Sequence, residues 1–161
     1  MDKDGKQEQP GIELASHREN VEMILGTIPH HQQLGISLYE MHDNGLTLKL
    51  PWHEKLIGYP ETGVVSGGCL ITLIDATLGF SVYLAVGKPL PSATLDLRLD
   101  YMRPAKVSST IYARGECYKC TRTIAFVRGF AWDDDPDHPI MTAAGSFIMD
   151  SSKKHGKGNA A

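Results

Sequence analysis

The stretch from Gly67 to Val86 restricts the fold of this chain more than any other segment, because it is almost entirely apolar and carries one charged side chain, Asp75. It contains no proline and is too long for a single strand. Its apolar residues fall on every side of a helical wheel, which predicts a helix that is buried all round. The early glycines, the hydroxyl side chains and the central aspartate would be costly in lipid, so we expect a buried helix of a soluble domain rather than a membrane span.

Length and charge restrict the class of protein. With 161 residues and a net charge of −3, the chain is expected to form one domain over residues 12–150, with polar, disordered ends at 1–11 and 151–161. We see no basic stripe of the kind that would indicate a nucleic-acid or membrane-surface partner. Nor do we see an apolar run near Met1 that would indicate a secretory signal. Three cysteines do not make a disulfide framework, so we expect a cytoplasmic protein.

Helical and strand patterns flank the apolar run. Residues 12–28 have helical spacing that ends at Pro29, and Asn44-Gly45 predicts a tight hairpin turn. The strand at 92–102 should alternate strictly, with Leu95 on the face of Leu97 and Thr94 on the opposite face. The expected strands are 33–41, 46–50, 92–102, 110–117, 123–132 and 140–149.

This order of elements, with a helix, two strands, a long helix and four strands, predicts an α+β fold. Strands with one apolar face need an element that covers that face. The helix at 67–86 is the large apolar element available for this purpose. The expected architecture is the hotdog fold, in which an antiparallel sheet of five to six strands curls around one long central helix, here with an extra N-terminal helix.

Asp75 is the residue most suited to chemistry. A buried carboxylate without a partner is expensive, so it is a candidate for function, although capping of a backbone group would also explain it. Ser66, Gly67 and Gly68 begin the same helix. Free amides at a helix start attract negative charge, while paired glycines alone would equally suit tight packing against a sheet. Together, the acid and the helix start favour hydrolysis of an activated carbonyl.

Three segments resemble the phenylacetate-pathway-type (PaaI-like) hotdog thioesterases. The first is 56–68, followed by Leu73-Ile74-Asp75; that family has Pro-Glu-Thr-Gly, His-Gly-Gly and an acid seven residues after the second glycine. The second, 99–105, resembles the family's Tyr-x-Arg-Pro strand end. The third, 29–36, resembles its entry into the first strand. The resemblance spans Pro29 to about Met149.

The resemblance implies an acyl-CoA thioesterase that releases a free acid and coenzyme A. Asp75 corresponds to the acid that serves as general base or nucleophile. Gly67 and Gly68 correspond to the helix-start glycines, one of whose amides polarises the thioester carbonyl from the opposite subunit. Thr94 corresponds to a hydroxyl near the acid. A homodimer, or a tetramer built as a dimer of dimers, is therefore expected, and no cofactor, since coenzyme A is part of the substrate.

The chain departs from the family at two positions. Ser66 stands where a histidine is usual, and Tyr59 where asparagine or aspartate is common. Serine is able to cap a helix start and tyrosine keeps a hydroxyl donor. Both, with Glu61 of the same segment, are candidate substrate-binding residues. The anionic nucleotide end of coenzyme A also predicts basic residues near the site, and our candidates are Arg103, Lys106 and Arg122.

Two short patterns in the sequence have other interpretations, and two alternative functions stay open. Cys117 and Cys120 lack a second pair of ligands, so no metal or redox site is expected. His30 and His31 are expected to lie in the connection from helix to strand. The chain could instead be a non-catalytic acyl-CoA-binding hotdog protein. It is less expected to be a hydroxyacyl-thioester dehydratase, because that chemistry usually needs a histidine near the position of Ser66.

Overall fold

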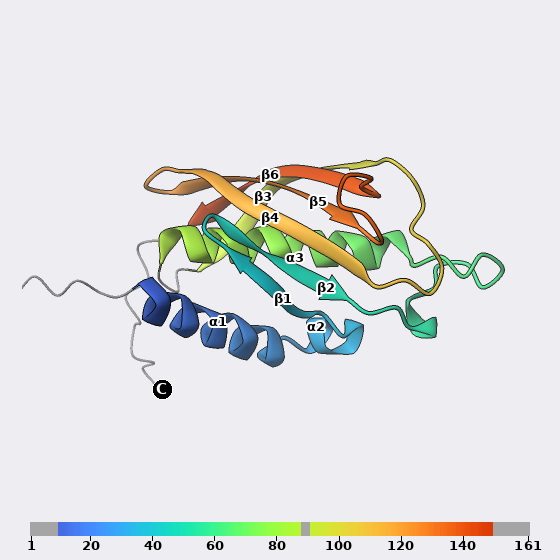
Figure 1. Ribbon diagram of the computed structural model, residues 1–161. Helices are drawn as coiled ribbons and strands as arrows, with labels where there is room; N and C mark the ends of the chain where they lie inside the picture. The colour runs from blue at the N-terminus through green and yellow to red at the C-terminus, as the bar shows by residue number, and fades with distance from the viewer. Residues whose placement is uncertain (1–9, 88–90, 150–161) are drawn as a thin grey trace, which may run out of the picture.

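The computed structural model describes residues 10–87 and 91–149 of the chain. In this part of the chain, three α-helices, one 3-10 helix and six strands follow one another (Figure 1). They are α1 (Pro10–Thr27), α2 (Pro29–Leu34), β1 (Ser37–His42), β2 (Gly45–Leu50), η1 (Glu54–Leu56), α3 (Gly67–Val86), β3 (Ser92–Tyr101), β4 (Ile111–Cys120), β5 (Ile124–Trp132) and β6 (Met141–Met149).

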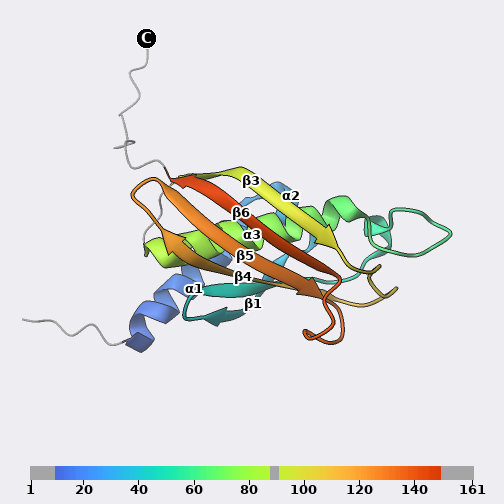
Figure 2. The same cartoon turned by 90° about the horizontal axis from the view of Figure 1, so that it is seen from above.

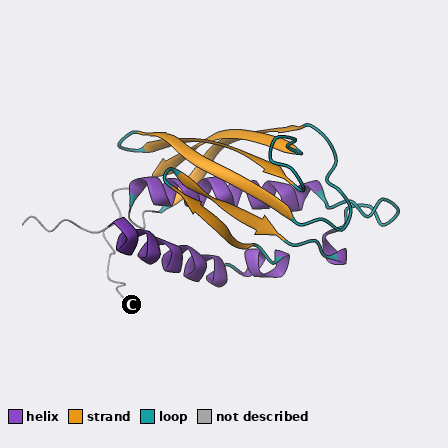
Figure 3. Cartoon of the chain, viewed as in Figure 1, coloured by secondary structure: helices purple, strands orange, loops and turns teal. Residues whose placement is uncertain are grey.

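The strands form one six-stranded sheet in the order β1-β2-β4-β5-β6-β3, and every neighbouring pair is antiparallel. The sheet curls around α3, which contacts five of the strands, and in Figure 2 the strands cross in front of this helix. Figure 3 shows α1 and α2 beside β1, on the side of the hairpin β1–β2. The predicted hotdog fold, with its central helix and extra N-terminal helix, is confirmed.

Small residues on the sheet allow α3 to pack closely. A Cβ atom added to Gly115 of β4 would lie 2.8 Å from Ser81 Oγ and 3.1 Å from Thr77 Cγ2 of the helix. Both hydroxyls are buried and donate to carbonyls one turn earlier, Thr77 to Leu73 at 2.7 Å and Ser81 to Thr77 at 2.8 Å. The hydroxyls are therefore satisfied within the helix and need no partner on the sheet.

The helix is not buried all round, so that expectation was wrong. Nine of its residues are buried, but the strip that contains Gly68, Ile71, Asp75 and Gly79 remains partly open, and Ile71 is 41% exposed. These positions recur every three to four residues and so share one side of the helix. By length and composition alone α3 would qualify as a membrane span, whereas in the fold one side of it packs against the sheet and nine of its residues are buried.

The segment before β1 also differs from the expectation. A strand was predicted from residue 33, but residues 29–34 form the short helix α2, which ends at Gly35 with a positive φ of 74°. The 3.6-residue period is not visible over six residues, and proline at the first position suits a helix start. At the ends of the chain, the predicted disorder of 1–9 and 151–161 lies outside the described residues, while Pro10 and Gly11 belong to α1. The expected glycine terminator of α3 is present, because Gly87 has a φ of 69°.

A bulge interrupts the alternation of β3. Thr94 pairs with Phe147 and Asp96 with Ser146, and the register shifts between them, at Leu95. The extra residue changes the face of everything before it. Thr94 therefore lies on the same face as Leu97, facing α3, and Leu95 is 54% exposed. The predicted strict alternation was wrong at this point, and the bulge decides where Thr94 points.

We predict that replacing Gly115 by alanine lowers the free energy of unfolding by about 1 to 3 kcal/mol, because the new methyl group overpacks the contact with Thr77 and Ser81. The matched control is Gly26→Ala in α1, where an added Cβ meets no atom within 4 Å. That change should leave stability unchanged or raise it by about 0.5 to 1 kcal/mol. Urea unfolding of both variants measures the difference, and equal stabilities would contradict the close packing of α3 on β4.

Candidate active site

Asp75 lies in the middle of α3, on its partly open side. Its carboxylate Oδ1 accepts a hydrogen bond of 2.8 Å from Thr94 Oγ1 of β3. Among the described residues, Oδ2 of Asp75 has no hydrogen-bond donor within reach. The bond from Thr94 fixes the carboxylate and leaves one oxygen available to a ligand. The predicted pairing of these two residues is present in the structure.

A cavity of about 720 Å³ opens beside this carboxylate. Its walls come from α1, α2, α3 and the adjoining ends of β3 and β6, and they are mainly apolar. The lining residues include Ile24, Ile28, His31, Asp75, Phe80, Tyr83, Thr94 and Phe147. A carboxylate and a hydroxyl at the edge of an apolar cavity form the usual arrangement of a small-molecule site.

The start of α3 is arranged differently from the expectation. Ser66 occupies the N-cap position, but its side chain makes no capping hydrogen bond, so the expected cap is absent. Gly67 and Gly68 are exposed, and the carbonyl of Gly67 accepts a hydrogen bond of 3.3 Å from the Tyr101 hydroxyl at the end of β3. Sequence reasoning missed Tyr101 as a neighbour of the helix start, although it belongs to the matched segment 99–105.

The structure does not bring the helix start and Asp75 of one chain together. Seven and eight residues separate Asp75 from Gly68 and Gly67, which is about 10 to 12 Å along a helix that rises 1.5 Å per residue. A carbonyl oxygen beside Asp75 is therefore too far from these amides to accept a hydrogen bond from them. Within one chain, the acid and the helix start are two separate features.

The remaining predicted substrate-binding residues lie at the surface. Tyr59 is 70% exposed and Glu61 is also exposed, both in the turn between η1 and α3. Arg122 is exposed in the turn between β4 and β5 and makes no ion pair within the described ranges. None of the three lines the cavity beside Asp75.

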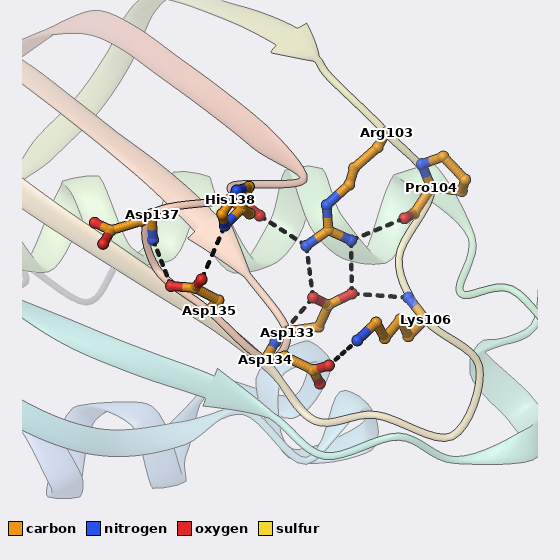
Figure 4. A network of polar contacts seen from close by, with 8 residues as sticks. All are labelled: Arg103, Pro104, Lys106, Asp133, Asp134, Asp135, Asp137 and His138. Atoms are coloured by element: carbon orange, nitrogen blue, oxygen red, sulfur yellow. Dashed lines mark hydrogen bonds and ion pairs between the residues drawn. The ribbon is translucent and has the colours of Figure 1, made fainter.

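Arg103 and Lys106 belong to a network of polar contacts between the β3–β4 and β5–β6 connections (Figure 4). Arg103 binds Asp133 through both guanidinium nitrogens, at 2.6 and 3.0 Å, and donates to the His138 carbonyl at 2.7 Å. The backbone amide of Lys106 also donates to Asp133, while its ammonium pairs with Asp134. These partners give the two basic side chains a structural role in this chain.

Asp133 is the centre of that network. Its side chain has no exposed surface, whereas that of Arg103 is 31% exposed. The hydrogen bonds from Arg103 hold the pKa of the Asp133 carboxyl below its usual range, against the opposing effect of burial, and the backbone amides of Lys106 and of Asp133 itself add to the lowering. The carboxylate is therefore fully compensated, as a buried charge must be.

His31 is a residue of the site that sequence reasoning missed. It was expected in the connection from helix to strand, but it lies on α2, and its side chain lines the same cavity as Asp75 and Thr94. Burial lowers the pKa of the His31 imidazole, the charge of His30 lowers it further, and Asp75 opposes the shift. No periodic signal in the sequence could have shown this, because the approach depends on how α2 docks beside α3.

The two cysteines of the Cys-x-x-Cys pair are close in space, with their Sγ atoms 3.3 Å apart. Residues three apart in a regular strand point to opposite faces, but a register shift between Cys117 and Lys119 turns both thiols to one side. Burial and the neighbouring thiol of Cys120 raise the pKa of Cys117 to about 12. No group of three or more histidine, cysteine or acidic residues suited to a metal ion occurs among the residues described by the structure.

Comparison with known families finds matches to the central part of the chain. A family model described as the thioesterase superfamily matches residues 62–140, which include the start of α3, Asp75 and Thr94. A curated protein of Halobacterium salinarum, provisionally named an esterase, is 42% identical over 76 residues, which are 45% of this chain and 50% of the relative. The chain thus spans about half the length of that curated relative.

Some solved structures are similar to a longer part of the chain. A protein of Pseudomonas aeruginosa is 41% identical, with a TM-score of 0.75 over 82% of this chain and 98% of that protein. The PaaI protein of Escherichia coli, from the phenylacetic acid degradation operon, gives a TM-score of 0.72 over 85% of this chain and 95% of that protein, at 13% identity. At this identity the similarity to PaaI shows the shared fold alone.

We predict that Asp133→Ala lowers the free energy of unfolding by about 3 to 5 kcal/mol, since it leaves Arg103 without its buried partner. The exposed Asp137→Ala is the control and should change stability by less than about 0.5 kcal/mol. Because folding lowers the pKa of Asp133, its contribution is complete above the pKa of an unfolded aspartate, about 3.9, and is lost as the pH falls through the lower folded value.

Urea unfolding of both proteins from pH 7 down to pH 2 measures this effect. The difference between wild type and Asp133→Ala should be constant above about pH 5 and should shrink below about pH 4. A difference that does not depend on pH would show that the Asp133 charge contributes nothing to the network.

Proposed function

We propose that this chain, which a thioesterase superfamily model matches over residues 62–140, hydrolyses the thioester bond of an acyl- or aryl-coenzyme A to the free acid and coenzyme A. The observation that carries this proposal is the carboxylate of Asp75. It is bound by Thr94 on one oxygen and has its other oxygen available beside an apolar cavity. Acid, hydroxyl and apolar cavity are the parts that such a reaction needs at the acyl end of the substrate.

The cavity supports an apolar acyl or aryl group as the part of the substrate that enters it. Phe80, Tyr83 and Phe147 provide aromatic walls. Ile24 of α1 and Ile28, the N-cap residue of α2, cover one side. With the carbonyl carbon beside Asp75, the carboxylate either removes a proton from an attacking water or attacks the carbonyl itself. A thiolate leaves readily, so the reaction needs little help from an acid at the sulfur.

A second copy of the chain completes the proposed site. The amides of Gly67 and Gly68 are about 10 to 12 Å from Asp75 along the same helix, so we propose that a partner subunit's helix start polarises the carbonyl. The strand β3 supports a dimer, because it is an edge of the sheet with nearly every residue exposed. An exposed edge strand is a template for pairing with another chain.

A tetramer would need a further surface. Tyr39, Tyr112 and Trp132 form a row of contacting rings on the outer face of the sheet, with centroids 4.8 and 5.6 Å apart. Tyr39 is 50% exposed although it is a large aromatic residue. We propose this row as the contact between two dimers.

The nucleotide end of coenzyme A would lie outside the cavity, at the surface of the assembly. Of the three proposed basic contacts, Arg122 has no ion pair among the described residues and remains the strongest candidate. Arg103 and Lys106 already bind acidic side chains of their own chain. We propose that the residues around the helix start shape the entrance for the substrate bound at the partner subunit's Asp75; they are Tyr59, Glu61 and Ser66. We also propose a cytoplasmic location, where coenzyme A esters are available.

One observation favours an alternative reaction. A hydroxyacyl-thioester dehydratase needs a histidine that works with an acid, and His31 lines the same cavity as Asp75. The substrate panel below should therefore contain a 3-hydroxyacyl-coenzyme A. Formation of an enoyl product without release of thiol would favour the dehydratase.

We predict that Asp75→Asn lowers kcat/KM by at least about a hundredfold, because asparagine keeps the shape of the side chain but neither removes a proton nor attacks the carbonyl. The measurement is release of coenzyme A thiol from phenylacetyl-, benzoyl-, acetyl-, hexanoyl- and palmitoyl-coenzyme A. Glu19→Gln, an exposed acid of α1, is the control and should match the wild type.

If the wild type binds these esters without turnover and Asp75→Asn binds them equally well, the chain is an acyl-CoA-binding protein and the hydrolase proposal is wrong.

We predict that two inactive variants restore each other's activity in mixed oligomers. One variant is Asp75→Asn, and the other is Gly67→Pro or Gly68→Pro, which removes one amide donor from the helix start, where proline is tolerated. Half of randomly mixed dimers would be mixed, and each would contain one intact site, so about one quarter of the wild-type activity should return.

Co-expression with two different affinity tags isolates the mixed dimers for this assay. No recovery in purified mixed dimers would show that each site belongs to a single chain.

A further inference from the structure

His31 is held in place by the backbone of its own short helix. Its carbonyl accepts the amide of Ile36 at 3.0 Å, and it also accepts the amide of Gly35, whose positive φ closes α2. The buried Ile36 ties this turn to the core at the start of β1. The side chain therefore enters the cavity from a fixed position, and its place opposite Asp75 does not depend on a mobile loop.

The imidazole of His31 has an unsatisfied atom. Its Nδ1 is buried and, among the described residues, has no hydrogen-bond partner. It is the only buried side-chain nitrogen or oxygen of this kind in the part of the chain that the structure describes. A buried polar atom without a partner is rare in folded proteins, so the position of this imidazole needs an explanation beyond packing.

The neighbouring histidine behaves differently. His30 is exposed, and its Nε2 lies 3.3 Å from the Thr72 hydroxyl of α3. It does not line the cavity. The two residues share a helix and a residue type but differ in burial and in surroundings, so His30 serves as an internal control for His31.

The charge state of His31 suits a hydrogen-bonding role. The ionisable groups near it are His30 on its own helix and Asp75 across the cavity, and Tyr83 of α3 lines the same cavity. Burial and His30 together outweigh Asp75, so the pKa of the imidazole lies below its usual value. The ring is thus neutral at pH 7, with one nitrogen as a donor and the other as an acceptor.

Resting on the thioester hydrolysis proposed above, we infer that His31 is a further catalytic residue, which holds the attacking water against Asp75 by a hydrogen bond to its neutral imidazole. The water gives one proton to the Asp75 carboxylate while its oxygen forms a bond to the thioester carbonyl carbon. The tetrahedral intermediate then breaks its carbon–sulfur bond. The proton on Asp75 passes to the leaving sulfur, which yields the acid, coenzyme A and the original carboxylate, with His31 unchanged.

This role makes activity depend on the neutral form of His31. As the pH falls through the lowered pKa of this residue, the imidazole takes up a proton and no longer accepts a hydrogen bond. It then no longer orients the attacking water. The wild-type kcat/KM should therefore decline on the acid side in a step that belongs to His31. A glutamine at position 31 stays neutral and should remove the step that belongs to the histidine.

The test compares His31→Ala and His31→Gln with His30→Ala, each in the full chain, using the member of the coenzyme A panel that the wild type hydrolyses fastest. His31→Ala should lower kcat at pH 7 by about a hundredfold with KM changed less than about threefold, and added imidazole should restore part of the rate. His31→Gln should keep more activity than His31→Ala and should lose the acid step that belongs to the histidine. His30→Ala should match the wild type.

Three results would overturn the inference. One is a His31→Ala rate equal to that of His30→Ala. Another is a loss of activity that follows a lower melting temperature and does not respond to imidazole. The third is an acid limb that is the same in His31→Gln and in the wild type, and this profile decides the matter even if His31→Ala does not fold. A wild type that releases no thiol from any ester would instead contradict the proposed hydrolysis itself. If the wild type is active and Asp75→Asn is inactive, the proposed hydrolysis stands, and the three results above test His31 alone.

Discussion

The close packing of α3 into the curled sheet is the constraint on which the rest of the structure depends. Leu73 and Leu78 are completely buried, and Gly115 on β4 lets the helix approach without a side chain between the two backbones. Packing on this side leaves one strip of α3 uncovered. Asp75 and Gly79 lie on that strip, where a charge does not have to be buried and a small residue leaves room. The arrangement of the core thus decides which part of the helix is available for chemistry.

Features with a local cause were predictable from the sequence. The bounds of α3 follow from an uninterrupted apolar run between Gly67 and Gly87, and the strands follow from turns and alternation. The short helix α2 has no such signal, because six residues with two histidines show no periodic pattern. Its place beside the cavity results from tertiary contacts. His31 could be recognised in the site only after the fold was known, whereas Asp75 stood out as a single charge in an apolar segment.

Thr94 and Arg103 show two different limits of prediction from the sequence. Strict alternation places Thr94 away from α3, and the bulge at Leu95, which has no clear sequence signal, turns it toward Asp75. The resemblance to a family located this residue better than the pattern did. Arg103 was predicted at the substrate, but it binds Asp133, thirty residues later in the chain. A basic residue near a strand end is equally suited to binding a substrate or an acidic side chain of its own chain. Only the fold shows that Arg103 lies beside Asp133.

In the proposed dimer, the open strip of α3 would supply half of each site. The helix start and Asp75 lie on the same side of one helix but about 10 to 12 Å apart, and β3, an exposed sheet edge, runs next to them. A two-fold axis beside β3 would place two such helices in opposite directions, so that each helix start faces the partner's acid. Symmetry then makes both sites identical. In that dimer, the distance that keeps the helix start away from Asp75 of its own chain would bring it to Asp75 of the partner, so the length of α3 between its first turn and Asp75 would set the geometry of the proposed reaction.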